Sequence, residues 1–316
     1  MKRDSDIRQN DKEKIMNIIE KKYFYFTISL LVIIPGVISL FLWRLNPSID
    51  FVGGSRLTLS FPKQVNNENI KIIKEVLLAQ KVELVSIQMS GKQVFIRTPV
   101  IDQKKDTEII NQLEKKNSSV KQDEFETIGP TIGSETTINA IKAVILACVF
   151  IILYIAWAFR KVPKPASSFR FGICAIIALI HDVLIVVGIF SILGHFFKVE
   201  VDSLFVTALL TILGFSVHDT IVVFDRIREN LRRMTGSPFP DIVNDSILQT
   251  FARSLNTSLT VLLVLFTLLL FGGESIRWFI VALLVGIASG TYSSIFNAAP
   301  LLVVWHEKSA KGGSRA

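Results

Sequence analysis

The chain has 316 residues, half of them hydrophobic, and a formal net charge of +8. Its mean hydropathy of +0.47 is too high for one ordinary soluble domain, and the apolar residues are clustered in runs, which indicates a membrane protein with several spans. The positive residues flank these runs, so the charge is typical of the positive-inside bias and no nucleic-acid partner is expected. The two cysteines form no metal-binding or disulfide pattern, and neither a metal nor a cofactor is expected.

The first part of the chain divides into a tail, a membrane helix and a soluble domain. Residues 1–22 carry charges of both signs, do not resemble a cleavable signal peptide, and are expected to form a cytoplasmic tail. Residues 23–43 form an apolar run of the length that spans a bilayer, with aromatic residues at both ends. Residues 44–135 contain β-prone and amphipathic helical segments in the order βαββαβ, which predicts a small ferredoxin-like α+β domain outside the cytoplasm. This domain contains no histidine or cysteine, so a binding or spacer role is expected rather than catalysis.

Residues 136–305 carry five further apolar runs, and the expected fold is therefore a polytopic α-helical membrane protein with six transmembrane helices. The runs lie at about 138–159, 171–193, 201–224, 255–271 and 278–305. The basic segments between and after them predict that both termini are cytoplasmic and that the domain of residues 44–135 is periplasmic. Residues 225–253 are expected to be a cytoplasmic loop, with a short amphipathic helix at 242–252 against the inner membrane face. Residues 306–316 are expected to be a second cytoplasmic tail.

One aspartate lies inside the fourth apolar run. Asp219 precedes the charged end of that run by about six residues, or roughly 9 Å of helix. An ionisable side chain at this depth costs roughly 2.5–3.5 kcal/mol on insertion scales and usually serves a function. Thr207, Thr211, Gly214 and His218 recur at helical spacing beside it. We expect this polar stripe to point into the helix bundle.

Arg253 opens the fifth span on the same membrane side as Asp219, and Thr257 follows it by one helical turn. If the two spans touch, Asp219 and Arg253 would pair, and separation of the pair would let the carboxylate bind a proton. The sequence thus suggests a proton relay. Arg253 can equally be read as an interfacial anchor whose charged end reaches the membrane surface.

A second polar position lies near the middle of the third run, where His181 and Asp182 repeat the His-Asp dipeptide of the fourth. Hydrogen bonding between helices is expected here rather than metal binding, because no third ligand accompanies the histidines. Asp182 is either a second member of the relay or a packing residue. In the last span, Gly286, Gly290, Ser294 and Asn297 form a small-residue face that we interpret as close helix packing.

Several motifs resemble those of the SecF family. They are IDFVGG at residues 49–54, TIGPTIGSE at 127–135, ALIHDVLIVVG at 178–188, FSVHDTIVVFDRIREN at 215–230 and SxxTSLT at 254–260. The resemblance extends over almost the whole chain in the correct order. The fourth-span motif includes a charged exit made of Asp225, Arg226, Arg228, Glu229 and Asn230.

This resemblance implies a subunit of SecDF, an accessory protein-export complex of the bacterial inner membrane in the resistance-nodulation-division superfamily. The family's six spans pair with six of SecD, and the complex associates with the SecYEG channel, often with YajC. It uses the proton-motive force to assist translocation of precursor proteins after SecA has acted, and SecF itself hydrolyses no ATP and is not an enzyme. The family's proton-transport residues match Asp219, Arg253 and the neighbouring Thr257 here. His218 stands where relatives commonly have Asn, which raises the question of whether it also takes up protons.

Two other functions are compatible with the residues. A proton-coupled exporter half for small molecules or lipids would need a larger outer domain than the roughly 90 residues available here. A passive scaffold of the translocon would use Asp219 only for a hydrogen bond between helices. Replacement of Asp219 by Asn separates the scaffold from the relay, because the amide keeps the shape but cannot bind a proton.

Overall fold

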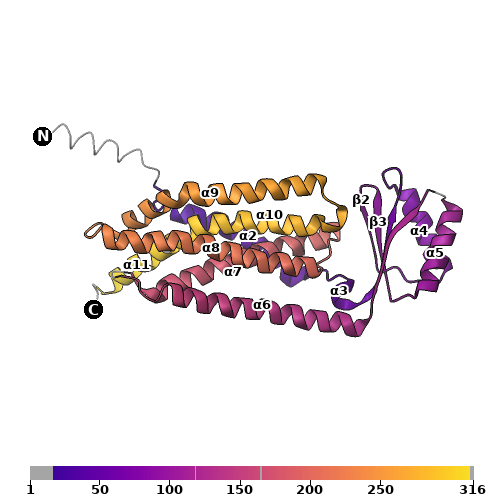
Figure 1. Cartoon of the computed structure of the whole chain (residues 1–316), viewed down its shortest axis with the longest axis horizontal. Coiled ribbons are helices and arrows are strands. Elements are labelled where there is room, and N and C mark those ends of the chain that lie inside the picture. Colours follow the sequence, from indigo (N-terminus) through magenta and orange to yellow (C-terminus); the bar gives the residue numbers. More distant parts are fainter. Residues whose placement is uncertain (1–16, 118, 164–165, 314–316) are drawn as a thin grey trace.

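The computed structural model describes residues 17–117, 119–163 and 166–313, so most of the tail expected at 1–22 lies outside the described residues. A helical bundle forms one end of the molecule and a small domain with a β-sheet forms the other (Figure 1). Within the described residues, six helical segments are long and apolar enough to cross a membrane, which confirms the predicted multi-pass membrane protein. They are α2 (Lys22–Trp43), α6 (Pro130–Ala158), α7 (Ser168–Phe197), α8 (Ser203–Arg233), α9 (Phe239–Phe271) and a last segment of residues 274–309.

The last segment is interrupted by irregular turns. It begins with a 3₁₀ turn (Glu274–Ile276) and continues as α10 (Arg277–Ser293). A π-helical turn (Ser294–Ala298) then leads into α11 (Ala299–Gly313). The sequence analysis expected one regular helix at 278–305 followed by a tail, whereas helix α11 continues through most of that tail.

The outer domain contains a four-stranded antiparallel sheet with two helices on one face. Its elements are β1 (Gly54–Ser60), α4 (Asn67–Ala79), β2 (Ser86–Ser90), β3 (Gln93–Thr98), α5 (Gln103–Lys116) and β4 (Lys121–Ile128). The strand order is β2-β3-β1-β4. Alternate residues of the strands, such as Leu57 and Ile96, are fully buried against Val76 of α4 and Leu113 of α5. The other face of the sheet is polar and lies toward the membrane helices.

A short joint connects this domain to the bundle at the IDFVGG motif. Helix α3 (Ile49–Val52) begins at Ser48, which accepts a hydrogen bond from the Asp50 amide at 3.2 Å. The following Gly53 has a φ of 77°, and a Cβ at this position would lie 2.9 Å from the Cα of Pro130. Glycine is therefore required here for both the backbone conformation and the close approach of α6.

The segment expected as a cytoplasmic loop at 225–253 is largely helical. Helix α8 continues to Arg233, and α9 begins at Phe239 and runs without interruption into the membrane span. The amphipathic stretch at 242–252 is thus part of α9 and not a separate helix. Its apolar residues Ile242, Val243 and Ile247 are buried within the protein core rather than against the membrane.

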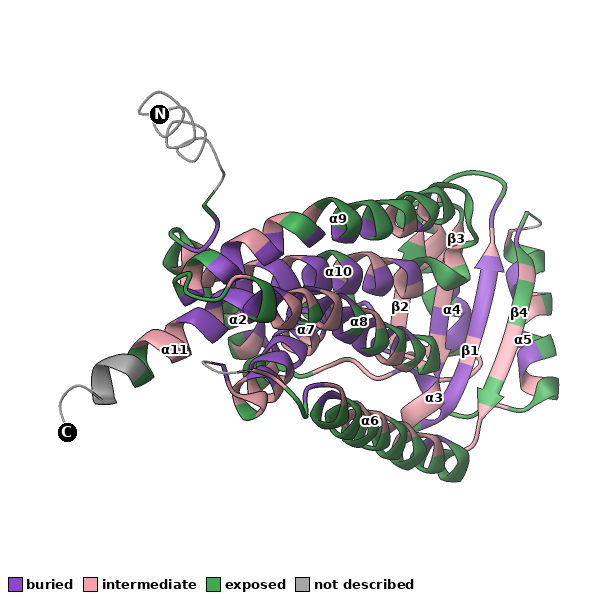
Figure 2. Cartoon of the chain, turned by 60° about the vertical axis from the view of Figure 1, so that its left-hand side comes forward, coloured by how far each residue is buried: buried purple, intermediate pink, exposed green. Residues whose placement is uncertain are grey.

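The helices of the bundle differ in how much of their surface the chain itself covers (Figure 2). In the most apolar stretch of α7, 56 % of the residues are buried, against 6 % in α6 and 17 % in α9. The exposed residues of α6 include Ile145, Leu146, Phe150 and Leu153. Helix α6 therefore presents an apolar surface suited to lipid, while α7, like α8 and the last segment, is covered much more fully by the rest of the chain.

Candidate functional site

Asp219 lies on α8 and is 6 % exposed. The Ser254 hydroxyl of α9 donates a hydrogen bond to Asp219 Oδ1 at 2.6 Å, and the Ser294 hydroxyl donates to Oδ2. None of the ion pairs among the described residues involves Asp219. The carboxylate is thus held by neutral donors from two other helices, in a place where an unpaired charge is costly.

Ser294 is the first residue of the π-helical turn in the last span. Such turns insert one extra residue into a helix and are frequent at functional sites. The preceding residue, Ser293, donates to Asp182 Oδ2 at 2.7 Å, whereas Ser294 donates to Asp219. Adjacent serines of one span therefore hold the two buried aspartates of the bundle.

Asp182 lies on α7 and is fully buried. Besides Ser293, its carboxylate accepts hydrogen bonds from Ser216 of α8 at 2.5 Å and from Ser289 of α10 at 2.7 Å. His181 Nδ1 lies 3.0 Å from Asp182 Oδ1. Side chains of α7, α8 and α10 thus meet at one carboxylate.

The network continues from His181 to the first membrane helix. The Asn297 amide donates to His181 Nε2 at 2.9 Å and to Ser29 Oγ of α2 at 2.8 Å. A neutral imidazole with its proton on Nδ1 satisfies both of its neighbours in this arrangement, because Nε2 then accepts and Nδ1 donates to Asp182. The expected hydrogen bonding between helices is present at His181, and no group of three or more potential metal ligands occurs among the described residues.

The polar stripe expected to point into the bundle lies on its outside. Thr207, Thr211, Gly214 and His218 are all exposed along α8. The reason is the helical period: Asp219 follows His218 by one residue, or about 100° around the axis, so the two side chains leave α8 in different directions.

The expected pair between Asp219 and Arg253 is absent from the described part of the chain. Arg253 and Thr257 are exposed on α9, while Ser254 and Ser258 of the same helix are buried. The Thr257 hydroxyl donates to the Arg253 carbonyl at 3.0 Å. The buried residue that α9 supplies to Asp219 is therefore a serine, and its arginine faces outward.

The charged exit of the fourth span consists of Asp225, Arg226, Arg228, Glu229 and Asn230, all on the extension of α8. Arg226 pairs with Glu229 at 2.5 Å, and Arg228 pairs with Asp225 at 2.5 Å. Asn230 is buried and donates to Ser246 of α9 at 2.8 Å. The two ion pairs lie within α8, and the Asn230 bond joins α8 to α9 beyond the apolar runs.

Gly286 and Gly290 of α10 lie against α8. A Cβ at Gly286 would come within 2.2 Å of Ile212, and one at Gly290 would lie 3.1 Å from the Ser216 Cβ. The second contact matters for the site, because Ser216 donates to Asp182. A glycine at residue 290 therefore lets α10 approach α8 closely enough for one carboxylate to reach both helices.

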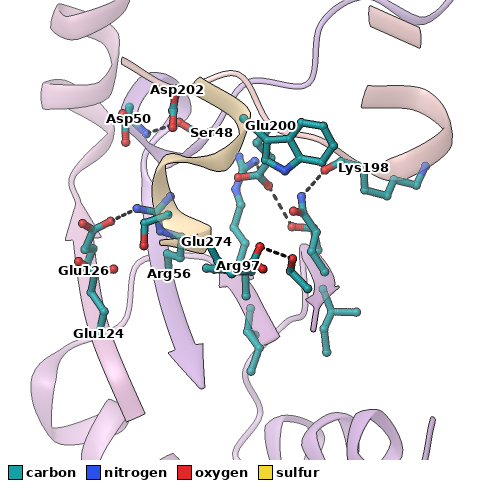
Figure 3. A pocket seen from close by; sticks show the side chains of 18 of the residues that line it. Ser48, Asp50, Arg56, Arg97, Glu124, Glu126, Lys198, Glu200, Asp202 and Glu274 are labelled. Carbon is teal, nitrogen blue, oxygen red and sulfur yellow. Dashed lines mark hydrogen bonds and ion pairs between the residues drawn. The ribbon is translucent and has the colours of Figure 1, made fainter. Parts of the chain in front are cut away.

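A cleft of about 940 Å³ lies between the polar face of the sheet and the outer ends of the membrane helices (Figure 3). Glu200, in the connection between α7 and α8, accepts hydrogen bonds from Ser86 at 3.1 Å and Arg97 at 3.4 Å. Burial raises the pKa of Glu200, and the nearby Arg97 charge opposes this shift. Burial likewise raises the pKa of Asp202, the N-cap of α8. This cleft was not predicted from the sequence.

The serines that hold the two aspartates were also missed. Ser294 and Asn297, assigned to packing, belong to the polar network, and Ser216, Ser254 and Ser293 were not singled out. Their spacing contains a usable signal, because Ser289, Ser293 and Asn297 recur every four residues in an otherwise apolar span. Polar residues on one face of a membrane helix indicate a face buried in protein.

Comparison with known proteins places this bundle in a family. The family described as protein export membrane protein SecD/SecF, C-terminal, matches residues 108–308. Protein translocase subunit SecF of Thermobaculum terrenum is 47 % identical, over 93 % of this chain and 95 % of its own length. Protein translocase subunit SecDF of Bacillus subtilis is 36 % identical over 93 % of this chain, which spans 38 % of that longer protein.

The fold is also found in a solved structure. The crystal structure of SecDF, a translocon-associated membrane protein from Thermus thermophilus, has a TM-score of 0.80 and 35 % identity to this chain. The match covers 92 % of this chain and 38 % of the SecDF chain. Sequence and structure agree over the outer domain and the bundle together, and the chain therefore belongs to the SecF family of protein translocase subunits.

Proposed function

We propose that this chain is the SecF-type half of a proton-driven accessory complex that assists export of precursor proteins through the Sec channel. Its partner is a SecD subunit, which contributes a second set of membrane helices. The chain is a transport component without catalytic activity of its own. Support comes from relatives named SecF and SecDF and from the buried carboxylate in the fourth span.

The observation that carries this proposal is the environment of Asp219. Its carboxylate is buried, has two serine donors from separate helices, and lies one residue from an exposed polar face. Protonation of Asp219 turns it from an acceptor into a group that also donates, so the bonds to Ser254 and Ser294 must rearrange. Because those serines lie on α9 and on the π-helical turn, a proton bound here would change the packing of two spans.

The exposed polar residues beside Asp219 fit a protein partner. The outer surface of α8 carries Thr207, Thr211 and His218, and the neighbouring α9 carries Arg253 and Thr257. Exposure of such groups to lipid is costly, and membrane helices usually turn them toward other helices. A SecD half that packs on α8 and α9 would cover this surface and bring its own residues next to Asp219 and Arg253.

The proposed orientation follows from the charges at the ends of the bundle. Arg160 and Lys161 follow the last residues of α6, Arg232 and Arg233 end α8, and these two helix ends lie opposite the outer domain (Figure 1). By the positive-inside rule this end and both termini are cytoplasmic, at the bacterial inner membrane, and the outer domain is periplasmic. The element order and strand order of that domain support its assignment to the ferredoxin-like class.

The test is precursor export into energised membrane vesicles that contain Asp219→Asn in complex with SecD. The amide keeps the size and accepts one serine bond, but it cannot bind a proton, so gradient-stimulated export is expected to fall at least tenfold while SecD still co-purifies. The matched control is Asp241→Asn, which replaces an exposed aspartate outside the apolar run. This control is expected to retain full export.

Full export by Asp219→Asn in an intact complex would overturn the proton relay and favour a scaffold. Loss of SecD binding would assign Asp219 to assembly instead. Export by Asp219→Glu, which keeps a titratable group, together with loss of export by Asp219→Asn, would support the relay.

A further inference from the structure

A crevice between α6 and α8 lies at the end of the bundle that carries the basic residues. It encloses about 290 Å³ where α6 ends and the extension of α8 passes beside it. Its lining combines the cations Arg160, Lys161 and Arg228 with the apolar side chains of Trp157 and Ile221. The crevice is separate from the two aspartates and from the cleft below the sheet.

Two of these cations are held in place by the protein. The Arg160 guanidinium lies over the Trp157 ring, 4.7 Å from its centroid, and donates to the Trp157 carbonyl at 3.3 Å. Arg228 donates to the Ala158 carbonyl at the end of α6 at 3.2 Å. These bonds use only some of the donors of each guanidinium, so both groups retain N–H donors for a further acceptor.

The charge of the crevice is positive. Asp225 is the acidic residue among its lining, and Arg228 pairs with it at 2.5 Å. Because this pair is neutral as a whole, the positive charges of Arg160 and Lys161 give the crevice its net positive charge. A ligand that carries negative charge and several oxygen acceptors is therefore the complement of the crevice.

The surface next to the crevice indicates which kind of anionic ligand would bind there. Tyr154 and Trp157 are 51 % and 61 % exposed and stack on each other at 6.2 Å, as expected of aromatic residues at a membrane interface. Further along α6, Phe150 and Leu153 are 61 % and 60 % exposed and form an apolar surface. An anionic group in the crevice would thus have a surface for hydrocarbon chains directly beside it.

We propose that this crevice binds the phosphate headgroup of an anionic glycerophospholipid, such as phosphatidylglycerol, while the acyl chains lie along α6. Basic pockets between membrane helices on the cytoplasmic side are a known form of lipid-headgroup site. The proposal rests on the membrane orientation proposed above. It does not depend on proton coupling or on any role of Asp219.

A general interfacial anchor could be built from the same residues, but its lipid binding would respond differently to substitutions and to the headgroup. Basic residues that only attract the membrane surface act together and are interchangeable, because their effect depends on charge and distance. A built site depends on which cations are removed and on the headgroup offered. The crevice predicts this second behaviour, since Arg160, in the turn after α6, and Arg228, on α8, are positioned around one space.

The test measures lipid binding to the full chain, purified with its SecD partner in neutral detergent, by native mass spectrometry. Phosphatidylglycerol and phosphatidylcholine are titrated separately, and phosphatidylglycerol is also titrated with inorganic phosphate as a competitor. The variant is Arg160→Gln with Lys161→Gln. The matched control is Arg232→Gln with Arg233→Gln, which removes two exposed charges at the same end of the bundle but outside the crevice.

The Kd for phosphatidylglycerol is expected to rise by about tenfold or more in the crevice variant, because each basic residue near an anionic headgroup contributes measurably to its binding. The control and the binding of phosphatidylcholine are expected to change by less than about threefold. Equal losses in both variants, or equal affinity for the two lipids, would overturn the proposal. Displacement of the lipid by inorganic phosphate would show that the crevice takes a free anion instead. None of these results depends on export, so they are separable from the outcome of Asp219→Asn.

Discussion

The same dipeptide, His-Asp, occurs in α7 and in α8, but its histidine has opposite environments in the two helices. In α7 both His181 and Asp182 are buried and share one hydrogen-bond network. In α8 Asp219 is buried and His218 is exposed. The two aspartates also differ, because Asp182 accepts three serine bonds and Asp219 accepts two.

The difference arises from which side chains each helix turns outward. Helix α7 contacts α2, α6, α8 and α10, and α8 contacts α6, α7, α9 and α10. Beside its His-Asp pair α7 exposes apolar side chains such as Ile177 and Ile180, whereas α8 exposes His218 itself together with Thr211. In α7 the whole His-Asp pair is part of the buried structure of the bundle. In α8 the aspartate is buried beside an exposed polar side, which is the side that the proposed SecD partner would cover.

The largest effect is expected from Asp182→Ala. Removal of this carboxylate leaves the hydroxyls of Ser216 and Ser289 without their acceptor and leaves Ser293 only its longer bond to the Gly290 carbonyl, and each unsatisfied buried group costs about 1–3 kcal/mol. The free energy of unfolding should therefore fall by roughly 3 kcal/mol or more, as measured by denaturation of the chain in detergent micelles. Asp182→Asn should lose less, because the amide oxygen still accepts.

The contrast with α8 supplies the control for this experiment. Asp219→Ala removes the acceptor of two serines instead of three and is expected to destabilise the chain less. A larger loss of stability from Asp219→Ala than from Asp182→Ala would contradict the assignment of Asp182 to structure and Asp219 to function.

A second, smaller effect is expected from the glycines of the two helices. A Cβ at Gly188 of α7 would lie 2.7 Å from the Gly36 Cα of α2, and neither backbone can move without separating the helices. Gly188→Ala should cost about 1–3 kcal/mol in the same denaturation assay. Gly214→Ala on the exposed polar side of α8 meets no atom of the chain within 4 Å, so it should leave the stability of the isolated chain nearly unchanged.

The histidines provide a third test of the same contrast. His181→Ala removes the link between Asp182 and Asn297, and it should cost about 1–2 kcal/mol of stability. His218→Ala should change the stability of the isolated chain by less than about 0.5 kcal/mol, as is usual for exposed positions. It should instead weaken co-purification of SecD. Equal losses of stability from both substitutions would show that His218 is packed against other parts of the chain and is not exposed.

The sequence was sufficient for the coarse fold because its signals are local. Apolar runs about 20 residues long predict membrane helices, and alternation with turns predicts the small sheet. The buried position of Asp219 also follows from its place in such a run. The outward direction of His218 could not be predicted in this way, because the hydropathy of α8 contains no information on which neighbouring helices cover each side.

The hydrogen-bond partners of the aspartates were beyond the sequence for a related reason. Ser254 lies 35 residues from Asp219 and Ser294 lies 75 residues away, so only the packing of three helices brings them together. The π-helical turn that presents Ser294 depends on that packing and has no pattern of its own in the sequence. The charge of Arg253 made it the predicted partner of Asp219, but the neighbouring Ser254 makes the hydrogen bond.

The smallest effect is expected at Glu200, where α7 and α8 connect below the outer domain. Burial raises the pKa of this carboxyl above its ordinary value of 4.5 while the domain is docked, and contact with water would restore the ordinary value on undocking. The docked state therefore favours the protonated carboxyl. Docking should be tightest at or below pH 4.5 and weaken as the pH rises through the raised pKa, above which it should no longer change with the ionisation of Glu200.

Hydrogen exchange of the β2 amides, expressed as protection factors relative to the intrinsic rate at each pH, measures docking, because the Ser86 and Gln88 side chains of β2 contact this connection. Glu200→Gln stays neutral, and its protection factors should be high and depend little on pH, apart from the part contributed by Asp202, whose pKa burial also raises. Lower protection factors at low pH in the unaltered chain would mean that the ion pair with Arg97, rather than the burial of Glu200, controls docking. In that case the ionised Glu200 carboxylate would hold the outer domain on the bundle, as Asp182 holds the helices around α7. Its ionisation would then strengthen docking instead of weakening it.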